Sequence, residues 1–265
     1  MKPKKQIINS LAKTDEDKVL IASALDKFEI CQTRGYITNT HFLDMRQRYL
    51  LEQALIKIGA QNQYIFWGGY EDAERVCAIF FPDYMTENQA KENSPITLVR
   101  ATKKPADELT HRDYLGSIMG LKINRDRIGD ILIGLHGADI VVMRDIAEFI
   151  KMNFVQAGRK QISVTELPLS DIIIPKGNES EGSGSVASLR LDSVIALVFS
   201  LSRSDAQEFI QKGLVYLNQV PCIKSGRDIA VGDKITVRGK GRCKITALGG
   251  QSRKGRQFLN YIKNV

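Results

Sequence analysis

The chain has 265 residues, 43% of them hydrophobic and 26% charged, with a formal net charge of +8 at pH 7. This composition predicts about two folded domains and argues against wholesale disorder. No run of about 18 apolar residues predicts a membrane span, and four widely spaced cysteines predict reduced thiols in a cytoplasmic protein, with no disulfide and no metal site.

The first 73 residues carry helical patterns. Thr14 is followed by three acidic residues, which is typical of a helix N-terminus, and apolar residues then recur at helical spacing from Ile21 to Phe28. A second helix is predicted from about Phe42 to Ile58, with Gly59 as its stop. The sequence therefore predicts an N-terminal, mainly helical domain over residues 1–73.

The period of the apolar residues changes over residues 74–174. The expected order is strand, strand, helix, strand, strand, helix, strand, at 76–81, 96–101, 112–121, 130–135, 139–143, 146–156 and 161–167. This order is typical of a helix-covered antiparallel sheet of ferredoxin-like type. The same plait underlies RRM-like RNA-recognition domains, although a fold alone does not establish a function.

Residues 175–187 are rich in Gly, Ser and charged side chains, which predicts a flexible linker. Residues 188–265 predict a small α/β domain, with one helix near 191–198, a second capped at Ser202, and short strands near 214–217, 221–224 and 234–238. The predicted fold class is therefore α+β, with a helical segment, a central plait, a linker and a small C-terminal domain.

Positive charge is concentrated in the last segment. From Val186 to Val265 there are 14 Lys/Arg against 5 Asp/Glu, a balance of 14 − 5 = +9, whereas the other residues hold 24 Lys/Arg and 25 Asp/Glu, or −1. No acidic residue follows Asp233. Such a field attracts a polyanion, because each phosphate that is neutralised releases condensed counterions. Nucleic acid is therefore the expected partner.

Three motifs lie in this basic segment: R-L-D at 190–192, S-R-S-x-A-x-x-x-I-x-x-G-x-V-x-x-N at 202–218, and G-D-x-I-x-V-R-G-x-G-R at 232–242. Together they resemble the RNA-binding domain named after small-subunit ribosomal protein S-four. That resemblance implies that a two-helix corner and its adjacent strands grip structured RNA. The contacts it implies are Arg190, Ser202, Arg203, Ser204, Gln207, Lys212, Asn218, Lys224, Arg238, Lys240 and Arg242.

Purely structural roles are the alternative for some of these residues. Ser202 and Ser204 could simply cap a helix, and Asp192 and Asn218 could simply hold turns. We favour the structural role for Asp192, and RNA contact for Arg203, Lys240 and Arg242, because arginine and lysine side chains suit phosphate.

Two further stretches extend the resemblance. F-W-G-G-Y-E-D-A-E-R at 66–75, and L-T-H-R-D-Y-L-G-S-I-M-G-L at 109–121 with I-G-D-I at 128–131, resemble signature stretches of the YlmH family of bacterial proteins. The family implies an RqcP-like factor of ribosome-associated quality control, bound to ribosomal RNA of the large subunit near transfer RNA. We expect a monomer without a cofactor. One departure is that residues 193–201 carry none of the basic side chains expected in the first helix of that group.

Other function classes stay open. His111-Arg112-Asp113 mimics a kinase catalytic loop, but Ile118 stands where Asn is required, so no catalytic residue is predicted. We treat His111 and Arg112 as a candidate second RNA-facing site, because they start a helix. An RNA-modifying enzyme of pseudouridine synthase or methyltransferase type and a cell-division adaptor are the alternatives, although residues 1–174 show neither a catalytic Asp loop nor a methyl-donor site.

Overall fold

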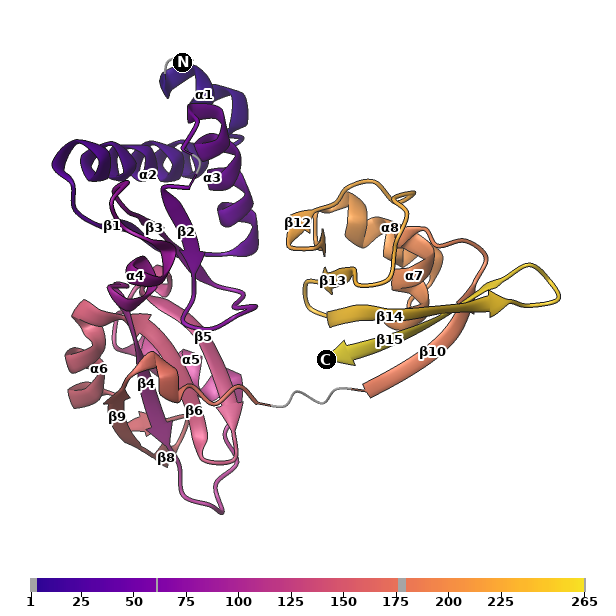
Figure 1. Cartoon of the computed structure of the whole chain (residues 1–265). Coiled ribbons are helices and arrows are strands. Elements are labelled where there is room, and N and C mark those ends of the chain that lie inside the picture. The colour runs from indigo at the N-terminus through magenta and orange to yellow at the C-terminus, as the bar shows by residue number, and fades with distance from the viewer. Residues whose placement is uncertain (1–3, 61, 176–179, 265) are drawn as a thin grey trace. The chain divides into compact units, whose positions relative to one another are not determined.

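The computed structural model describes residues 4–60, 62–175 and 180–264 (Figure 1). The chain divides into two compact units, Met1–Pro175 and Lys176–Val265. Within the described residues, no helix is both long and apolar enough to cross a membrane. The same residues contain no group of His, Cys, Asp and Glu side chains that could hold a metal ion.

At the start of the first unit, the helices α2 and α3 pack against a small antiparallel sheet of order β1-β3-β2, and α1 packs on these two helices (Figure 1). α2 begins where predicted, because the Thr14 hydroxyl accepts a hydrogen bond from the Asp17 amide at 3.2 Å. A left-handed glycine, Gly35 or Gly59, ends each of the two longer helices. The elements are α1 (Lys4–Leu11), α2 (Asp15–Arg34), β1 (Thr38–Leu43), α3 (Met45–Ile58), β2 (Tyr64–Trp67) and β3 (Val76–Phe80).

The strand over Val76–Phe80 was assigned to the wrong sheet. We expected it to open the central plait, but β3 pairs with β1 and β2 and completes the N-terminal sheet. All five of its residues are buried. A strand buried on both faces shows no alternation that would indicate which sheet it joins. The predictions also missed β1 and β2 inside the helical segment, because β1 mixes polar with apolar residues and β2 has only four residues.

The remaining elements of the first unit form the predicted ferredoxin-like plait. The order β4, α5, β5, β6, α6, β9 builds an antiparallel sheet of order β5-β6-β4-β9, and α5 and α6 cover one of its faces. The elements are α4 (Glu87–Glu92), β4 (Ile96–Thr102), α5 (His111–Gly120), η1 (Arg125–Arg127), β5 (Ile128–Gly134), β6 (Gly137–Met143), η2 (Arg144–Ile146), α6 (Ala147–Asn153), β7 (Gln156–Ala157), β8 (Lys160–Gln161), β9 (Ser163–Leu167) and η3 (Leu169–Asp171).

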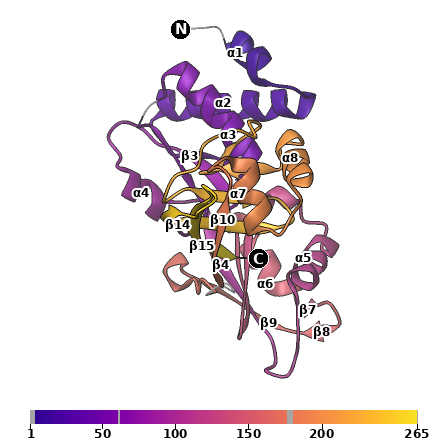
Figure 2. The ribbon, with the colours of Figure 1, turned by 90° about the vertical axis from the view of Figure 1, so that its right-hand side faces the viewer.

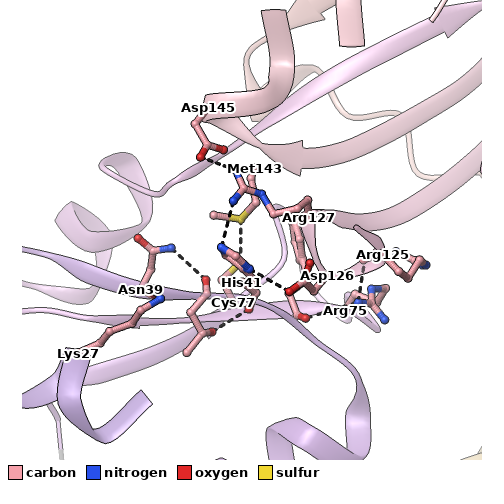
Figure 3. A network of polar contacts seen from close by, with 12 residues as sticks. Lys27, Asn39, His41, Arg75, Cys77, Arg125, Asp126, Arg127, Met143 and Asp145 are labelled. Atoms are coloured by element: carbon pink, nitrogen blue, oxygen red, sulfur yellow. Dashed lines mark hydrogen bonds and ion pairs between the residues drawn. The ribbon is translucent and has the colours of Figure 1, made fainter. Parts of the chain in front are cut away.

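The two sheets of this unit are joined by a shared core and by a polar network. Cys77 of β3 and Met143 of β6 belong to one buried apolar cluster. At its margin His41 lies between Asp126, 2.9 Å from its Nδ1, and Arg127, whose Nη1 is 3.1 Å from its Nε2 (Figure 3). This network ties β1 to η1, so the N-terminal sheet and the plait pack as one unit.

The second unit is a sheet of order β10-β15-β14-β13-β11-β12 with α7 and α8 on one face (Figures 1 and 2). The apolar face predicted for α7 is confirmed, because Leu191, Val194, Ile195 and Val198 are all buried in its core. The elements are β10 (Ser180–Val186), α7 (Leu191–Val198), α8 (Arg203–Gln211), β11 (Val215–Leu217), β12 (Val220–Pro221), β13 (Lys234–Val237), β14 (Gly241–Gln251) and β15 (Gln257–Asn264).

The predicted linker 175–187 was wrong over most of its length. Residues 180–186 form β10, which pairs with β15 from Ser180 to Val186, while residues 176–179 lie outside the described part of the chain. A Cβ at Gly182 would lie 2.4 Å from Cζ of Tyr261, and one at Gly184 would lie 2.7 Å from Cδ1 of Leu197. These glycines permit close packing rather than flexibility.

Candidate nucleic-acid interface

A buried carboxylate organises the corner between α7 and α8. Asp192, at the first turn of α7, is fully buried. Its Oδ2 accepts hydrogen bonds from Nε2 of Gln207 at 2.9 Å and from Nε of Arg203 at 3.1 Å, and its Oδ1 lies 3.3 Å from Nε of Arg190. Burial raises the pKa of Asp192, but the hydrogen bonds from Gln207, Arg203 and Arg190 outweigh that effect and hold the pKa below its ordinary value. Asp192 is therefore an ionised anchor.

The two arginines on this anchor remain open to solvent. The side chain of Arg203 is 55% exposed and that of Arg190 is 41% exposed. Arg203 contacts Asp192 through Nε, and a guanidinium has five donors, so this bond leaves the donors at its outer edge unused. Arg190, Arg203 and Gln207, which the sequence predicted separately, thus form one positioned group that we call the Asp192 corner.

A loop from the sheet packs beside this corner. The amide of Leu191 donates to the carbonyl of Arg227 at 2.8 Å, and the amide of Asp192 donates to the carbonyl of Ser225 at 3.1 Å. These bonds bring the exposed side chains of Lys224 and Arg227 next to the start of α7. The sequence analysis did not include Arg227, although it lies three residues after Lys224, which was a predicted contact.

The polar residues of the predicted site have local structural bonds. Ser202 caps α8, because its Oγ accepts from the Asp205 amide at 3.0 Å, and its Oγ also lies 2.8 Å from that of Ser204. Asn218 has a φ of 50°. Its side-chain Nδ2 donates to Oδ1 of Asp233 at 2.8 Å, and its side-chain Oδ1 accepts from the backbone amide of Lys234 at 2.9 Å. These are the helix-cap and turn roles that the sequence left open as alternatives.

The remaining predicted cations lie apart from the Asp192 corner. Lys212 pairs with Glu208 on the outer side of α8. Lys240 extends over the ring of Phe209 of α8, 6.0 Å from its centroid, and Arg238 is exposed at the end of β13. Arg242 pairs with Thr236, on the opposite side of the pleat from the buried Cys243. The structure therefore distributes the predicted site over more than one surface.

The candidate second site lies in the first unit, near the contacts between the YlmH-like stretches 66–75 and 128–131. Asp130 accepts hydrogen bonds from the hydroxyl of Tyr70 at 2.8 Å and the amide of Arg75 at 3.1 Å. Arg75 in turn donates to the carbonyl of Arg125 at 3.4 Å (Figure 3). Burial and the nearby Arg125 lower the pKa of His111, while Asp130 opposes them.

Two arginines, Arg75 and Arg125, lie close together at this second site. Burial and the neighbouring Arg75 lower the pKa of Arg125 to about 10. Arg112 is exposed beside His111 at the start of α5. Asp113, the third residue of the kinase-like triplet, accepts from both the amide and the hydroxyl of Thr110, at 2.8 and 2.7 Å, and so caps α5.

Comparison with known proteins assigns the family. Residues 96–171 match the family model "Putative RNA-binding domain in YlmH", and residues 189–235 match that of the S4 domain. The chain is 32% identical over 249 residues to "Ribosome-associated protein quality control protein P2" of Bacillus subtilis (strain 168), with 93% of this chain and 95% of that protein covered. The chain belongs to the YlmH family.

A solved structure gives a further match to this YlmH-family protein. "Cell division protein ylmH from Streptococcus pneumoniae" matches with a TM-score of 0.48 and 22% identity, over 61% of this chain and 97% of that chain. The S4 match includes the Asp192 corner but ends at Ile235, within β13. β10, β14 and β15 therefore lie outside both matched ranges.

Proposed function

We propose that this YlmH-family protein is a non-catalytic RNA-binding factor of ribosome-associated quality control. It binds ribosomal RNA of the large subunit, near transfer RNA, on particles that hold stalled nascent chains. It works in the cytoplasm, as a monomer without a cofactor. The name of the Bacillus subtilis relative and the two matched RNA-binding domains support this assignment.

The Asp192 corner is the observation that carries the proposal. A free arginine loses rotamer freedom when it grips a phosphate, and that loss reduces affinity. Asp192 holds Arg190 and Arg203 in place before RNA arrives, so less freedom is lost on binding. The corner thus recognises the geometry of a folded RNA backbone by the placement of its guanidinium groups.

A non-catalytic role suits the local chemistry better than an RNA-modifying enzyme. The carboxylate in the kinase-like triplet, Asp113, is occupied as a helix cap, and that of Asp192 is occupied by Gln207 and two arginines. Each of these acids has a structural partner set that a general base or nucleophile would have to give up.

Gradient sedimentation of the full-length tagged protein tests the proposal. We expect comigration with large subunits at about 50 mM salt and release by roughly 200 mM, because phosphate contacts weaken steeply with salt. The variant Arg190→Ala/Arg203→Ala should leave the particle at lower salt, whereas Lys5→Ala/Arg34→Ala, with the same charge change on the N-terminal helices, should behave like wild type. Sedimentation as free protein at low salt would contradict the proposal. A modified nucleoside missing from the ribosomal RNA of a deletion strain would favour the enzyme.

A further inference from the structure

The strands β14 and β15 are joined by a tight turn, residues 252–256, which we call the hairpin loop. The amide of Ser252 donates to the carbonyl of Arg256 at 2.8 Å, and the amide of Arg256 donates to Oγ of Ser252 at 3.0 Å. Gly255 has a φ of 72°, and its amide donates to the carbonyl of Ser252 at 2.8 Å. Three-residue hairpin connections commonly end in such a left-handed residue, which glycine adopts readily. Arg253 and Lys254 therefore occupy the apex of an ordered turn.

The base of the hairpin loop is fixed to the neighbouring strand. Gln257 pairs with Gln251 of β14 and with Val186 of β10. Nε of Arg256 donates to Oγ of Ser185 at 3.0 Å, and its Nη2 donates to the carbonyl of the same residue. These two bonds tie the start of β15 to the end of β10. The apex cations therefore stand on a ribbon that is supported from one side.

The hairpin loop projects beyond the core of the unit. Leu259 is fully buried, whereas all of residues 253–256 are exposed. Lys254 lies five residues before Leu259, which at the spacing of a strand is a reach of roughly 15 Å. In Figure 1 the loop, in yellow, lies to the right of the helices α7 and α8. Its side chains are therefore accessible to a large partner.

The charge of the hairpin loop is entirely positive. It carries Arg253, Lys254 and Arg256, and residues 234–265 contain no Asp or Glu. The one acid of β10, Glu181, lies at the end of that strand away from the loop. A projecting group of cations attracts a polyanion, and both the guanidinium and the ammonium group donate hydrogen bonds to phosphate oxygens.

The hairpin loop lies at the same end of the sheet as the Asp192 corner. β10 ends at Val186, beside Gln257, and Arg190 of the corner follows only four residues later. Four residues span at most about 14 Å, even when fully extended. One folded RNA segment can therefore contact the corner and the hairpin loop together.

We propose that the hairpin loop is a further RNA contact, in which Arg253 and Lys254 bind backbone phosphates of the RNA that the Asp192 corner also binds. This inference rests on the proposed function, and it places a contact outside the residues that match the S4 domain. Arg256 is a positioning residue, because its guanidinium is bonded to Ser185. The apex has no apolar side chain to bury, which favours RNA over a lipid surface or an apolar protein contact.

The variant Arg253→Gln/Lys254→Gln tests this contact in the full chain, with purified large ribosomal subunits as the probe. We expect about tenfold weaker binding at roughly 100 mM salt, and a slope of log K against log salt that is shallower by about two. Lys5→Gln/Arg34→Gln removes the same charge from the N-terminal helices and should keep the wild-type slope. Arg253→Lys/Lys254→Arg keeps both charges and should restore the slope. All these side chains are exposed, so the melting temperatures should match that of wild type.

Hydroxyl-radical footprinting of the bound subunits shows whether the hairpin loop contacts RNA. At saturating protein, the wild type should protect backbone positions that become cleavable with Arg253→Gln/Lys254→Gln. A different set of positions should become cleavable with Arg190→Gln/Arg203→Gln, because the corner and the loop contact different phosphates.

The outcomes separate this inference from the proposed function. If wild type binds subunits and Arg190→Gln/Arg203→Gln weakens binding, while Arg253→Gln/Lys254→Gln matches its control in slope and footprint, the hairpin loop is not an RNA contact and the proposed function stands. Weaker binding with an unchanged footprint in Arg253→Gln/Lys254→Gln would assign the loop to a protein contact and also overturn the inference. No binding by wild type would reject the proposed function itself.

Discussion

Oδ2 of the fully buried Asp192 lies 3.1 Å from Nε of Arg203, whose side chain is 55% exposed. The pair therefore spans the boundary between core and solvent, with the anion inside and the cation outside. A buried charge left without a partner is strongly destabilising, so the Asp192 carboxylate needs the arginines as its charge partners, and the arginines are in turn positioned by the carboxylate. The proposed RNA contact therefore couples RNA binding to stability at this point.

Asp192→Asn tests that coupling through stability. We expect the free energy of unfolding of the second unit to fall by about 2 kcal/mol, because the arginines lose their charged acceptor. Hydrogen exchange of peptides from α7 and α8 measures it. Asp205→Asn, an exposed acid in the first turn of α8, should change the exchange rates little.

The same variant makes a prediction about pH. The pKa of Asp192 is below its ordinary value of 3.8, so its stabilising effect is present above that value and is lost as the pH falls through the lower native pKa. The stability difference between wild type and Asp192→Asn should therefore be largest at neutral pH and shrink below about pH 4. A difference that grew in acid would show that the carboxylate is not held in its ionised form.

Arg203→Ala tests the phosphate contact. We expect weaker RNA binding and a salt slope that is shallower by about one, because one phosphate contact is lost. Filter binding to ribosomal RNA at a series of salt concentrations measures both quantities. Arg34→Ala, at the exposed end of α2, serves as the control for charge alone. Identical slopes for the two variants would remove Arg203 from the interface.

Gly182→Ala tests whether residues 180–186 are a strand. The added methyl group would collide with the ring of Tyr261, so we expect a loss of about 2 kcal/mol in the stability of the second unit. Ser183→Ala changes the neighbouring residue, which faces solvent, and should be nearly neutral. Thermal unfolding of both variants gives the comparison. Equal melting temperatures for the two variants would instead support the original prediction that these residues form a flexible linker.

His111 reports the electrostatics of the second site. Its pKa lies below the ordinary value of 6.5 because of burial and the nearby Arg125, so Arg125→Gln should raise it. The native protein favours the neutral ring, and the stability this contributes is lost as the pH falls through 6.5. An NMR titration of the ring measures the shift. If the pKa of His111 were the same in Arg125→Gln as in wild type, burial alone would be the cause of its lowered pKa.

Local patterns were sufficient to predict much of this fold. Thr14 and Ser202 marked helix starts, and the apolar spacing of α7 showed which of its faces is buried. Long-range pairing could not be predicted in the same way. β10 consists mostly of Gly, Ser and Glu, and its role depends on Tyr261 and Leu197, which lie far along the chain.

For the candidate site too, the local features could be predicted from the sequence and the long-range ones could not. The residue types of the Asp192 corner were recognisable, and its geometry follows from two adjacent helices. Arg242 was predicted as part of the same contact surface, but the register of β13 with β14 places it on the opposite face. Register depends on the partner strand, which the local sequence of β14 does not reveal.

The position of β15 has a consequence for biosynthesis. β15 lies between β10 and β14 in the sheet, so β10 has no neighbouring strand until β15 has been made. During translation the second unit cannot complete its sheet while β15 is still inside the exit tunnel. A copy of this protein that stalls before β15 would therefore expose an unpaired strand edge, which can pair with other chains and aggregate.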